Sequence, residues 1–443
     1  MYLLYSVLIV AFFAVMSPYL AYQAVRYRKY VRSLPQRLGY LPLSFNLDGD
    51  ESIWIHAVSV GEVLTARALL PELRTRYPRL RVFLSTTTMT GQEIARNNLQ
   101  YVDAVFYFPF DLGFIVNRTL ALVRPRLFIM METEIWPNLL RACRRAGVKT
   151  MLVNGRISSR SYPRYRLARP FFRRVLGDVD RFCMQGDESA RRIVDIGADP
   201  SRVAVTGSLK FDSLEVPGAP AVDRGRNRVL RYFRVSPGRP VVIAASTLKG
   251  EEEPVFEAFQ RIRATITNAL LIVAPRRPER FDEVERLARR SGWSVARRSE
   301  LPVDSEPRYD VVILDTIGEL AQLYQVATAV FVGGSLVDAG GHNILEPAVF
   351  GKAIVFGPHM QNFAEIARTF LDNGAAIQVR NGRELEPALV ELLRNPIRRA
   401  SLGAAARALV EANRGARSKS LAVIAQLLQT DEPGHVVPFR VVH

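Results

Sequence analysis

Residues that form disulfide frameworks and metal centres are scarce in this sequence. It holds 2 cysteines and 5 histidines in 443 residues. Cys143 and Cys183 are too few for a disulfide framework or a metal cluster, so we expect both to pack as small apolar side chains. His56, His342 and His359 are scattered and lack the spacing of metal ligands. The sequence therefore predicts no metal site and no bound cofactor.

Other signatures are missing too, and their absence excludes further classes of protein. There is no Gly-Lys-Ser of a P-loop. There is also no zinc motif, RNP-like sequence or basic patch interleaved with aromatic residues, which argues against a nucleic-acid-binding module. The pairs Asp48–Asp50 and Asp178–Asp180 have the Asp-x-Asp form that holds a divalent metal in many sugar-nucleotide transferases. We interpret both pairs as turns, because the first of them precedes the first predicted strand.

Acidic residues are in deficit, with 43 Asp and Glu against 60 Lys and Arg and a formal net charge of +17. This balance favours an anionic partner, either nucleic acid or the surface of an anionic membrane. The alternative is a solvated, arginine-rich surface without a partner. The N-terminal segment favours the membrane.

Charged side chains are absent from residues 1–25, and residues 2–16 are almost wholly apolar. Such a segment can span a bilayer or lie deep in one leaflet. A cleaved signal peptide is the alternative, but its basic n-region is missing. Basic residues follow directly, which by the positive-inside rule places the rest of the chain in the cytoplasm. We therefore predict a single-pass or monotopic anchor over residues 1–25, followed by the charges of Arg26, Arg28, Lys29 and Arg32.

Beyond this segment, short apolar runs alternate with helical patterns such as 63–76 and 252–266. The runs are nearly continuous in apolar residues, which is typical of parallel strands buried on both faces. The pattern occurs twice and predicts two doubly wound α/β domains. The expected strands are 52–60, 81–87, 104–109, 126–132 and 150–155 in the first half, and 240–246, 269–275, 311–315, 328–334 and 352–357 in the second.

A Pro- and Gly-rich stretch divides the two halves. The predicted order is an anchor (1–25), an N-terminal Rossmann-like domain (26–214), a linker (215–225), a C-terminal Rossmann-like domain (226–430) and a tail (431–443). Two such domains joined by a short linker suggest a ligand cleft between them. Ligands of parallel sheets bind at the carboxyl ends of the strands, so the chemistry is expected just after each apolar run.

Glu62 follows the first strand and opens a helix. Before it, Ser59-Val60-Gly61 forms a turn of small residues that gives access to the end of the strand. The structural alternative is an acid that suits the helix dipole in the first turn. A carboxylate at this place can instead take a proton from a hydroxyl group.

Glu132 and Glu134 end another apolar strand, where two acids are costly unless they are paired or hydrogen-bonded. They are either functional groups or members of a structural ion pair with an arginine. Lys210 is one of very few lysines and lies shortly before the linker. Its compact ammonium group can bind a phosphate or a carboxylate, and a surface lysine is the alternative.

Two pairs of glycines surround one helix start in the segment 330–352. Gly333-Gly334 ends a strand, and Gly340-Gly341 leads into the run His342–Glu346. Glycines let backbone N–H groups approach a phosphate, and the helix start offers further donors. Glu346 is placed to accept hydrogen bonds from ribose hydroxyls. A helix cap with loop glycines is the alternative.

Two more strand ends carry candidate residues. Thr316 and Glu319 have the spacing of a capping box, and Gly318 between them can expose backbone donors to a nucleotide. Arg276 and Arg277 follow the strand 269–275, where an anionic ligand would bind. Surface arginines are the alternative at this position.

Several motifs then occur in order along nearly the whole chain: WIHAVSVGE, ETEIWPN, NGRIS, GSLKFD, PERF, GGHNILEPA and GPHMQNF. Together they resemble the 3-deoxy-D-manno-octulosonic acid (Kdo) transferases of glycosyltransferase family 30. The resemblance implies a GT-B fold with an N-terminal acceptor domain and a C-terminal domain that binds CMP-Kdo. It also implies inverting, metal-independent transfer of Kdo to the lipid A disaccharide precursor (lipid IVA) in lipopolysaccharide core biosynthesis, at the cytoplasmic face of the inner membrane.

The resemblance also assigns roles to matching positions. Glu62 is expected to be the general base, and Glu132 and Lys210 are expected to stabilise the transition state. Leu248 and Arg277 stand where family members often have histidine, so no histidine role is carried to them. The residues expected to hold CMP are Pro275, Arg276, Ile317, Gly318, Glu319, Gly341, His342, Asn343, Ile344, Leu345 and Glu346.

The chemistry of CMP agrees with this interpretation. CMP has a single phosphate, so lysine, arginine and a helix N-terminus can offset its charge without a metal. The expected partners are CMP-Kdo, a lipid A precursor and the anionic inner-membrane surface, with no nucleic acid. A different membrane-associated GT-B transferase, using another nucleotide sugar, is the remaining alternative.

Overall fold

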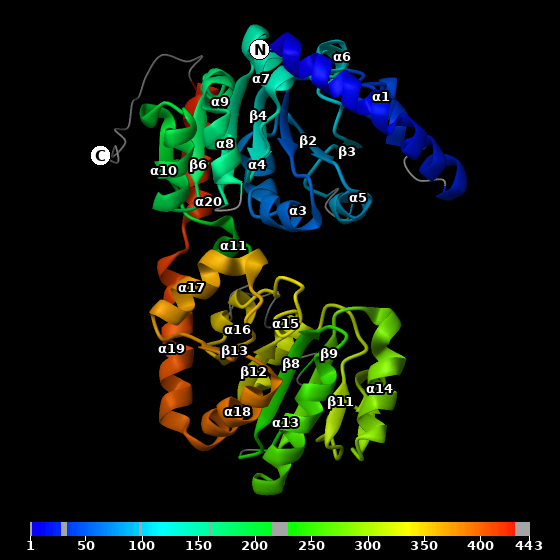
Figure 1. The fold of residues 1–443 in the computed structure, drawn as a ribbon, viewed down its shortest axis with the longest axis vertical. Helices are drawn as coiled ribbons and strands as arrows, with labels where there is room; N and C mark the ends of the chain where they lie inside the picture. Colours follow the sequence, from blue (N-terminus) through cyan, green and yellow to red (C-terminus); the bar gives the residue numbers. More distant parts are fainter. Residues whose placement is uncertain are drawn as a thin grey trace. The chain divides into compact units, whose positions relative to one another are not determined.

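The structure is a computed structural model that describes residues 2–27, 33–96, 100–158, 161–214, 229, 231–236 and 238–429 (Figure 1). The chain forms two compact units. Unit 1 comprises Met1–Ser213 and Asn413–His443, and unit 2 comprises Leu214–Ala412. The predicted linker 215–225, the predicted tail 431–443 and the basic residues Arg28, Lys29 and Arg32 lie outside the described residues.

Unit 1 is built on a seven-stranded sheet of order β3-β2-β1-β4-β5-β6-β7. All neighbouring strands are parallel. The chain extends the sheet from β1 in one direction and then returns to extend it in the other, which is the doubly wound arrangement that we predict. The strands are β1 (Ser52–His56), β2 (Arg81–Thr86), β3 (Ala104–Tyr107), β4 (Pro125–Met131), β5 (Lys149–Gly155), β6 (Arg181–Met184) and β7 (Val203–Val205).

Side chains on the two faces of this sheet enter two separate cores. Trp54 and Phe83 belong to one core, and Ile53 and Val82 belong to the other. Both faces are apolar and covered by helices, which explains the nearly continuous apolar runs of these strands. The helices are α2 (Leu34–Arg37), α3 (Val60–Ala66), α4 (Leu70–Arg76), α5 (Met89–Arg96), α6 (Gly113–Val123), α7 (Pro137–Arg145), α8 (Tyr162–Leu167), α9 (Arg169–Leu176), α10 (Asp187–Ile196) and α11 (Leu209–Asp212).

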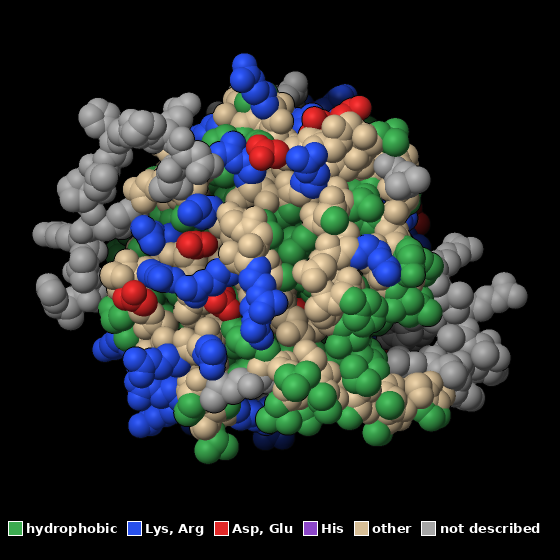
Figure 2. All heavy atoms as spheres, turned by 90° about the horizontal axis from the view of Figure 1, so that it is seen from above, with side chains coloured by type: hydrophobic (Ala, Val, Ile, Leu, Met, Phe, Trp, Pro, Cys, Tyr) green, Lys and Arg blue, Asp and Glu red, His purple; other side chains and the backbone are tan. Residues whose placement is uncertain are grey.

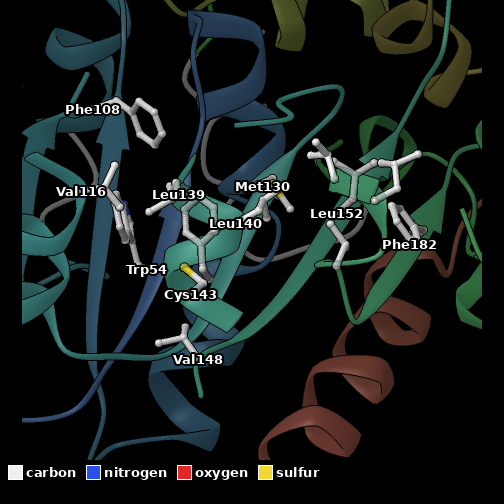
Figure 3. Close-up of a cluster of buried hydrophobic side chains, with 14 of the residues drawn as sticks. Trp54, Phe108, Val116, Met130, Leu139, Leu140, Cys143, Val148, Leu152 and Phe182 are labelled. Carbon is white, nitrogen blue, oxygen red and sulfur yellow. The ribbon is translucent and has the colours of Figure 1, made fainter. Parts of the chain in front are cut away.

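The core with Trp54 is shown in Figure 3. Leu139, Leu140 and Cys143 of α7 pack there against the large side chains of the sheet. Cys143 and Cys183 are both fully buried as free thiols, which confirms the prediction that they pack as small apolar groups.

Unit 2 repeats the same plan with a parallel sheet of order β10-β11-β9-β8-β12-β13-β14. Two parallel α/β units are therefore confirmed. The strands are β8 (Val241–Thr247), β9 (Leu270–Pro275), β10 (Val295–Arg297), β11 (Val311–Ile313), β12 (Ala329–Val332), β13 (Ala353–Phe356) and β14 (Ile377–Gln378). The helices are α13 (Glu252–Thr265), α14 (Phe281–Arg290), α15 (Leu320–Leu323), α16 (Leu345–Val349), α17 (Ala364–Asp372), α18 (Leu385–Arg394) and α19 (Pro396–Ala412).

Two details of the secondary structure differ from the prediction. The sequence does not predict the strands β6, β7, β10 and β14, because each is only 2 to 4 residues long and its apolar run is no longer than three residues. The predicted helix 63–76 is divided into α3 and α4. Pro71 lies in the first turn of α4, where its missing N–H group is tolerated, but it cannot continue an earlier helix.

The final helix, α20 (Ala416–Gln429), belongs to unit 1, whereas the predicted C-terminal domain ran to residue 430. Its apolar side chains, including Leu421 and Ile424, enter the core that contains Ile53 and Val82. Its apolar pattern predicts a buried face but does not specify the domain against which that face packs. The C-terminal boundary of unit 2 therefore lies before α20, and the prediction that placed it after this helix is wrong.

The N-terminal helix α1 (Tyr2–Tyr27) belongs to unit 1, and one stripe of its first four turns packs against the rest of that unit. Tyr2 donates a hydrogen bond to Asp178, and Ser6 accepts one from the side-chain amide of Asn138 at 3.0 Å. The ring of Phe13 lies 4.5 Å from that of Phe110. Across the described part of the chain, no helix is both long enough and apolar enough to cross a membrane.

Candidate active site

The first set of predicted residues lies at the carboxyl edge of the unit 1 sheet. β1 ends at His56, and a short turn leads into α3, with Glu62 in its first turn. The Glu62 side chain points back over this turn and is buried, with 8% of its surface exposed. Its carboxylate accepts hydrogen bonds from the N–H of Val58 at 2.9 Å and from the hydroxyl of Ser59 at 3.0 Å.

Burial raises the pKa of Glu62 to about 7. The N–H group of Val58 and the Ser59 hydroxyl oppose this rise because they stabilise the charged form, whereas the nearby charge of Glu132 adds to it. A carboxyl group with this pKa is partly ionised at neutral pH and accepts a proton more readily than an ordinary surface glutamate. These are the properties of a general base.

Glu132 directly follows β4, in a left-handed backbone conformation with a φ of +56°. Its backbone N–H donates to the carbonyl of Val153 at 2.9 Å, so the residue continues the sheet for one more step. Its carboxylate lies 3.8 Å from the ammonium nitrogen of Lys210. The structure therefore brings Glu62, Glu132 and Lys210 to the same edge of unit 1.

Lys210 is held at this edge by the short helix α11. The side-chain oxygen of Asn154, at the end of β5, accepts the N–H of Leu209 at 3.0 Å. On the other side, Asp212 accepts the N–H groups of Gly415 and Arg417, at 2.9 and 3.0 Å, at the start of α20. Neither Asn154 nor Asp212 was predicted, because these contacts join segments that are far apart in the sequence.

Glu134 is a further acid that the sequence indicated but to which we assigned no role. Burial and the charge of Glu62 raise the pKa of Glu134 to about 8, so it is mostly protonated at neutral pH. A neutral Glu134 can donate a hydrogen bond, whereas an ionised one would add to the repulsion among the acids. The edge of unit 1 thus combines several carboxyl groups with one ammonium group.

The second set lies at the carboxyl edge of the unit 2 sheet. Gly340 and Gly341 both have positive φ values, +87° and +74°, and lead to Asn343 and the short helix α16. The side-chain amide of Asn343 donates to Glu346 at 3.1 Å, and its oxygen accepts the N–H of Leu345 at 3.1 Å. Asn343 therefore orients the carboxylate that was predicted to meet ribose hydroxyls.

Arg276, directly after β9, acts electrostatically on His342 and Glu346. Burial, together with the charge of Arg276, lowers the pKa of His342 to about 4, so this histidine is neutral at pH 7. Burial raises the pKa of Glu346, while Asn343 and Arg276 oppose the rise. The predicted residues after β9 and β12 are thus close enough to share one electrostatic environment.

The turn at Ile317–Glu319 is held by Arg298, which the sequence analysis does not identify. The carboxylate of Glu319 accepts a hydrogen bond from Thr316 at 2.7 Å and one from Arg298 at 2.9 Å. Gly318 has a φ of +88°, and Ile317 is 84% exposed. With its carboxylate occupied inside unit 2, Glu319 shapes the turn, and the exposed surface for a ligand is that of Ile317 and Gly318.

Both sets therefore lie after parallel strands, within their own units. Unit 1 offers a buried glutamate with further acids and a lysine beside it, whereas unit 2 offers an arginine, glycine-rich backbone and a half-buried carboxylate. No cluster of three or more His, Cys, Asp or Glu side chains suited to a metal ion occurs within the described ranges.

Comparison with known proteins shows similarity over nearly the whole chain. Residues 32–213 match the family described as 3-deoxy-D-manno-octulosonic-acid transferase (kdotransferase). The chain is 33% identical over 416 residues to a 3-deoxy-D-manno-octulosonic acid transferase of Haemophilus influenzae, which covers 92% of this chain and 94% of the relative. It is 36% identical over 381 residues to the transferase of the same name from Bordetella pertussis, with 83% and 86% covered.

Solved structures share the fold at low identity. A glycosyltransferase from Rickettsia africae aligns with 86% of this chain and 99% of its own at a TM-score of 0.56 and 11% identity. A UDP-GlcNAc 2-epimerase from Neisseria meningitidis aligns with 86% of this chain and 100% of its own at a TM-score of 0.58 and 11% identity. The two α/β units thus have the architecture of GT-B glycosyltransferases.

Proposed function

The chain belongs to the 3-deoxy-D-manno-octulosonic acid (Kdo) transferase family and is a glycosyltransferase that transfers Kdo, and from this premise we propose that CMP-Kdo is its donor and lipid IVA its acceptor. The reaction joins a hydroxyl oxygen of the lipid A disaccharide precursor to the anomeric carbon of Kdo. The bond between that carbon and the phosphate oxygen breaks, and CMP leaves. Such a reaction belongs to lipopolysaccharide core biosynthesis.

The observation that carries this proposal is the buried Glu62 beside Glu132 and Lys210. Glu62 takes the proton of the acceptor hydroxyl as the new bond forms, because its pKa of about 7 suits proton transfer at neutral pH. Attack from the face opposite to CMP gives inversion at the anomeric carbon. Lys210 and Glu132 lie 3.8 Å apart and stabilise the charges that develop as the sugar becomes cation-like and CMP departs.

Unit 2 binds the CMP part of the donor in this proposal. Arg276 faces the phosphate, and Glu346, oriented by Asn343, accepts hydrogen bonds from ribose hydroxyls. Ile317 and Gly318 present an apolar side chain and open backbone to the base. Because CMP carries one phosphate, lysine and arginine suffice to offset its charge, and the reaction proceeds without a metal.

The acceptor is a lipid, so we further propose that α1 holds the enzyme at the cytoplasmic face of the inner membrane. Residues 2, 5, 6, 9, 13 and 16 of α1 face unit 1, whereas the other face is exposed. The exposed face carries these large apolar side chains: Leu3, Leu4, Val7, Leu8, Val10, Phe12 and Val15. A helix with one stripe packed against the enzyme and the other face apolar is suited to lie in the plane of one leaflet.

Basic residues surround the start of α1 and support the same orientation. The guanidinium group of Arg141 lies 4.4 Å from the ring centre of Tyr2. Figure 2 shows basic and hydrophobic side chains gathered on one face of the molecule, with few acidic ones. Cations beside an apolar surface favour anionic lipids. The exposed arginines of α8 and α9 are Arg164, Arg166, Arg169, Arg173 and Arg174.

The proposal is tested by measuring Kdo transfer from CMP-Kdo to lipid IVA with wild type and Glu62→Gln. We expect the variant to bind CMP normally but to lose transfer by a factor of about 10² to 10⁴, because it cannot accept a proton. Full activity of Glu62→Gln would exclude it as the base. Thermal melts with CMP and with UDP separate this donor from other nucleotide sugars, since only a bound ligand raises the melting temperature.

A further inference from the structure

Glu251 is a fully buried acid that the proposed reaction does not use. It lies at the start of α13, just after β8. One of its carboxylate oxygens accepts the N–H of Leu248 at 2.9 Å and of Gly334 at 2.6 Å. The other accepts the N–H of Ser335 at 3.0 Å and of Leu336 at 2.9 Å. One side chain thus binds four backbone N–H groups from the turns that follow β8 and β12.

The turn after β12 approaches Glu251 so closely that it depends on glycine. A Cβ atom at Gly333 would lie 2.9 Å from a carboxylate oxygen of Glu251 and 2.7 Å from the carbonyl oxygen of Ser246. Gly334 has a φ of +65°, which is unfavourable for other residues. Successive N–H groups that converge on an anion are stable only when the anion is present, since buried donors need acceptors. The turn and the carboxylate therefore depend on each other.

The same turn supports the residues that we assign to CMP. The carbonyl of Gly334 accepts the N–H of Gly341 at 2.7 Å. The ring of His342 packs on Gly334 so closely that a Cβ atom there would lie 2.9 Å from it. Directly after this contact comes Asn343, which orients Glu346. A shift of the turn after β12 would therefore move the start of α16 as well.

A second connection leads to the turn after β13. The hydroxyl of Ser335 accepts the N–H of Gly357 at 2.8 Å, and its carbonyl accepts the N–H of His359 at 2.9 Å. Glu251 thus holds the turn after β12, which in turn contacts the turn after β13. Three neighbouring strand ends on the ligand edge of unit 2 are joined through one carboxylate.

Comparison of the two units shows what is particular to Glu251. Glu62 and Glu251 occupy corresponding places, each after the first strand of its unit and at the start of the next helix. In unit 1 the neighbouring strand β4 is followed by the acids Glu132 and Glu134. In unit 2 the neighbouring strand β12 is followed by a turn in which the N–H groups of Gly334, Ser335 and Leu336 face the carboxylate. Glu62 of unit 1 can therefore exchange a proton, whereas both carboxylate oxygens of Glu251 in unit 2 accept two hydrogen bonds each.

We propose that Glu251 is a positioning residue for donor binding, which fixes the turn after β12 and through it the residues that contact CMP. The identity of the ligand rests on the proposed function, but the hydrogen-bonded arrangement does not. Loss of Glu251 is expected to weaken donor binding specifically, because the acceptor residues lie in unit 1. A role confined to folding would lower stability without changing the affinity of the folded enzyme for CMP.

The test compares Glu251→Gln with Glu253→Gln in the full chain. Glutamine has the same shape, but its amide nitrogen would face two N–H donors in place of an acceptor. Glu253 is exposed in the first turn of the same helix, so it controls for the loss of one charge. We expect Glu251→Gln to raise the Kd of CMP and the KM of CMP-Kdo by about tenfold or more, with the acceptor KM unchanged. Glu253→Gln should match wild type.

A folded Glu251→Gln with wild-type affinity for CMP and wild-type donor KM would overturn the proposal. Should Glu251→Gln fail to fold, Glu251→Asp is the second variant, because it keeps the charge but is one methylene shorter. We expect its affinity for CMP to lie between those of wild type and Glu251→Gln. Amide hydrogen exchange gives a readout without ligand: the N–H groups of Gly334, Ser335 and Leu336 should exchange slowly in wild type and faster in Glu251→Asp. Equal exchange in the two proteins would contradict the role of Glu251, whereas failure of wild type to bind CMP would contradict the proposed donor.

Discussion

The ammonium nitrogen of Lys210 lies 3.8 Å from a carboxylate oxygen of Glu132, although 78 positions separate these residues in the chain. Both side chains are mostly buried, with 22% and 18% of their surfaces exposed. The pair joins the end of β4 to α11 and places a positive charge beside an edge that is otherwise rich in carboxyl groups. This arrangement leads to the first prediction.

Replacement of Lys210 by glutamine should lower kcat by about 10² to 10³, because a cation that stabilises the departing phosphate is lost. The KM values should change much less. Steady-state kinetics of Kdo transfer measure both quantities. Lys419→Gln is the matched control, since Lys419 is an exposed lysine of the same unit and should have no effect. A Lys210→Gln enzyme with normal kcat would remove this residue from the mechanism.

The second prediction concerns the pH profile. A general base acts when deprotonated, so kcat/KM should rise with pH and level off above the Glu62 pKa of about 7. The Ser59 hydroxyl donates to Glu62 and keeps this pKa lower than burial alone would make it. Ser59→Ala should therefore move the rising limb to higher pH by about half a unit to one unit.

The control for this shift is Thr75→Ala, which removes a hydroxyl from an exposed helix of the same unit. Its pH profile should coincide with that of wild type. If the rising limb of the Ser59→Ala profile moved to lower pH, a group other than Glu62 would determine the pH dependence of kcat/KM. At high pH the Ser59→Ala enzyme should recover most of its activity, because Glu62 is then ionised in both proteins.

The third prediction concerns the free energy of unfolding, which should depend on pH through the same pKa of Glu62. The folded-state pKa of Glu62 lies above its ordinary value, so the folded protein binds the proton more tightly than the unfolded chain. Stability from this group is present at low pH and is lost as the pH rises through about 7. Glutamine cannot ionise. Glu62→Gln should therefore gain about 2–3 kcal/mol relative to wild type between pH 5 and pH 8.5.

Thermal or denaturant unfolding at the two pH values measures this gain. The comparison needs no substrate, and it also shows whether the inactive Glu62→Gln protein is folded. An equal stability difference at pH 5 and pH 8.5 would indicate that Glu62 titrates normally in the folded state.

Arg298 provides a prediction in unit 2. It is buried, its guanidinium group lies 3.4 Å from the ring centre of Tyr232, and it donates to Glu319 at 2.9 Å. Arg298→Gln should loosen the turn at Ile317–Glu319 and raise the Kd of CMP by about tenfold, as measured by calorimetry. Arg290→Gln, at an exposed position of the same unit, should leave it unchanged. Unaltered CMP binding by Arg298→Gln would separate this turn from the nucleotide site.

The last prediction concerns the exposed face of α1. Leu8 is 59% exposed there, and Leu47 is 75% exposed elsewhere in unit 1. Leu8→Glu should lower partition into anionic vesicles by about tenfold or more, because an apolar group is replaced by a charge that anionic lipids repel. Leu47→Glu adds the same charge and should bind vesicles like wild type. Equal losses in the two variants would mean that net charge, not α1, governs the membrane association.

The secondary structure followed from the sequence wherever the chain gave a strong local signal. The long apolar runs became strands, and Glu62 lies in the first turn of the helix after β1, as predicted, although Val60 and Gly61 of the expected turn already belong to that helix. The weak signals failed for physical reasons. Edge strands such as β7 and β14 bury little surface and need no apolar run, and Pro71 divided a helix whose periodicity continues across it.

The candidate residues were also accessible to sequence reasoning, because parallel sheets direct their carboxyl ends to one edge. Their supporting partners were not. Asn154, Asp212 and Arg298 form hydrogen bonds with residues 21 to 205 positions away. Nothing in the local pattern of a sequence distinguishes such side chains from surface polar residues.

By itself, the sequence determined two α/β units, the strand ends at which polar residues gather, and the family to which the chain belongs. Only the tertiary structure decided that α20 returns to unit 1 and that one stripe of α1 packs against the enzyme. It also decided that Glu251 binds four N–H groups, whereas burial raises the pKa of Glu62 to about 7. Periodicity records which side of an element is buried, but the energy of a buried charge depends on the groups that the fold brings to it from elsewhere.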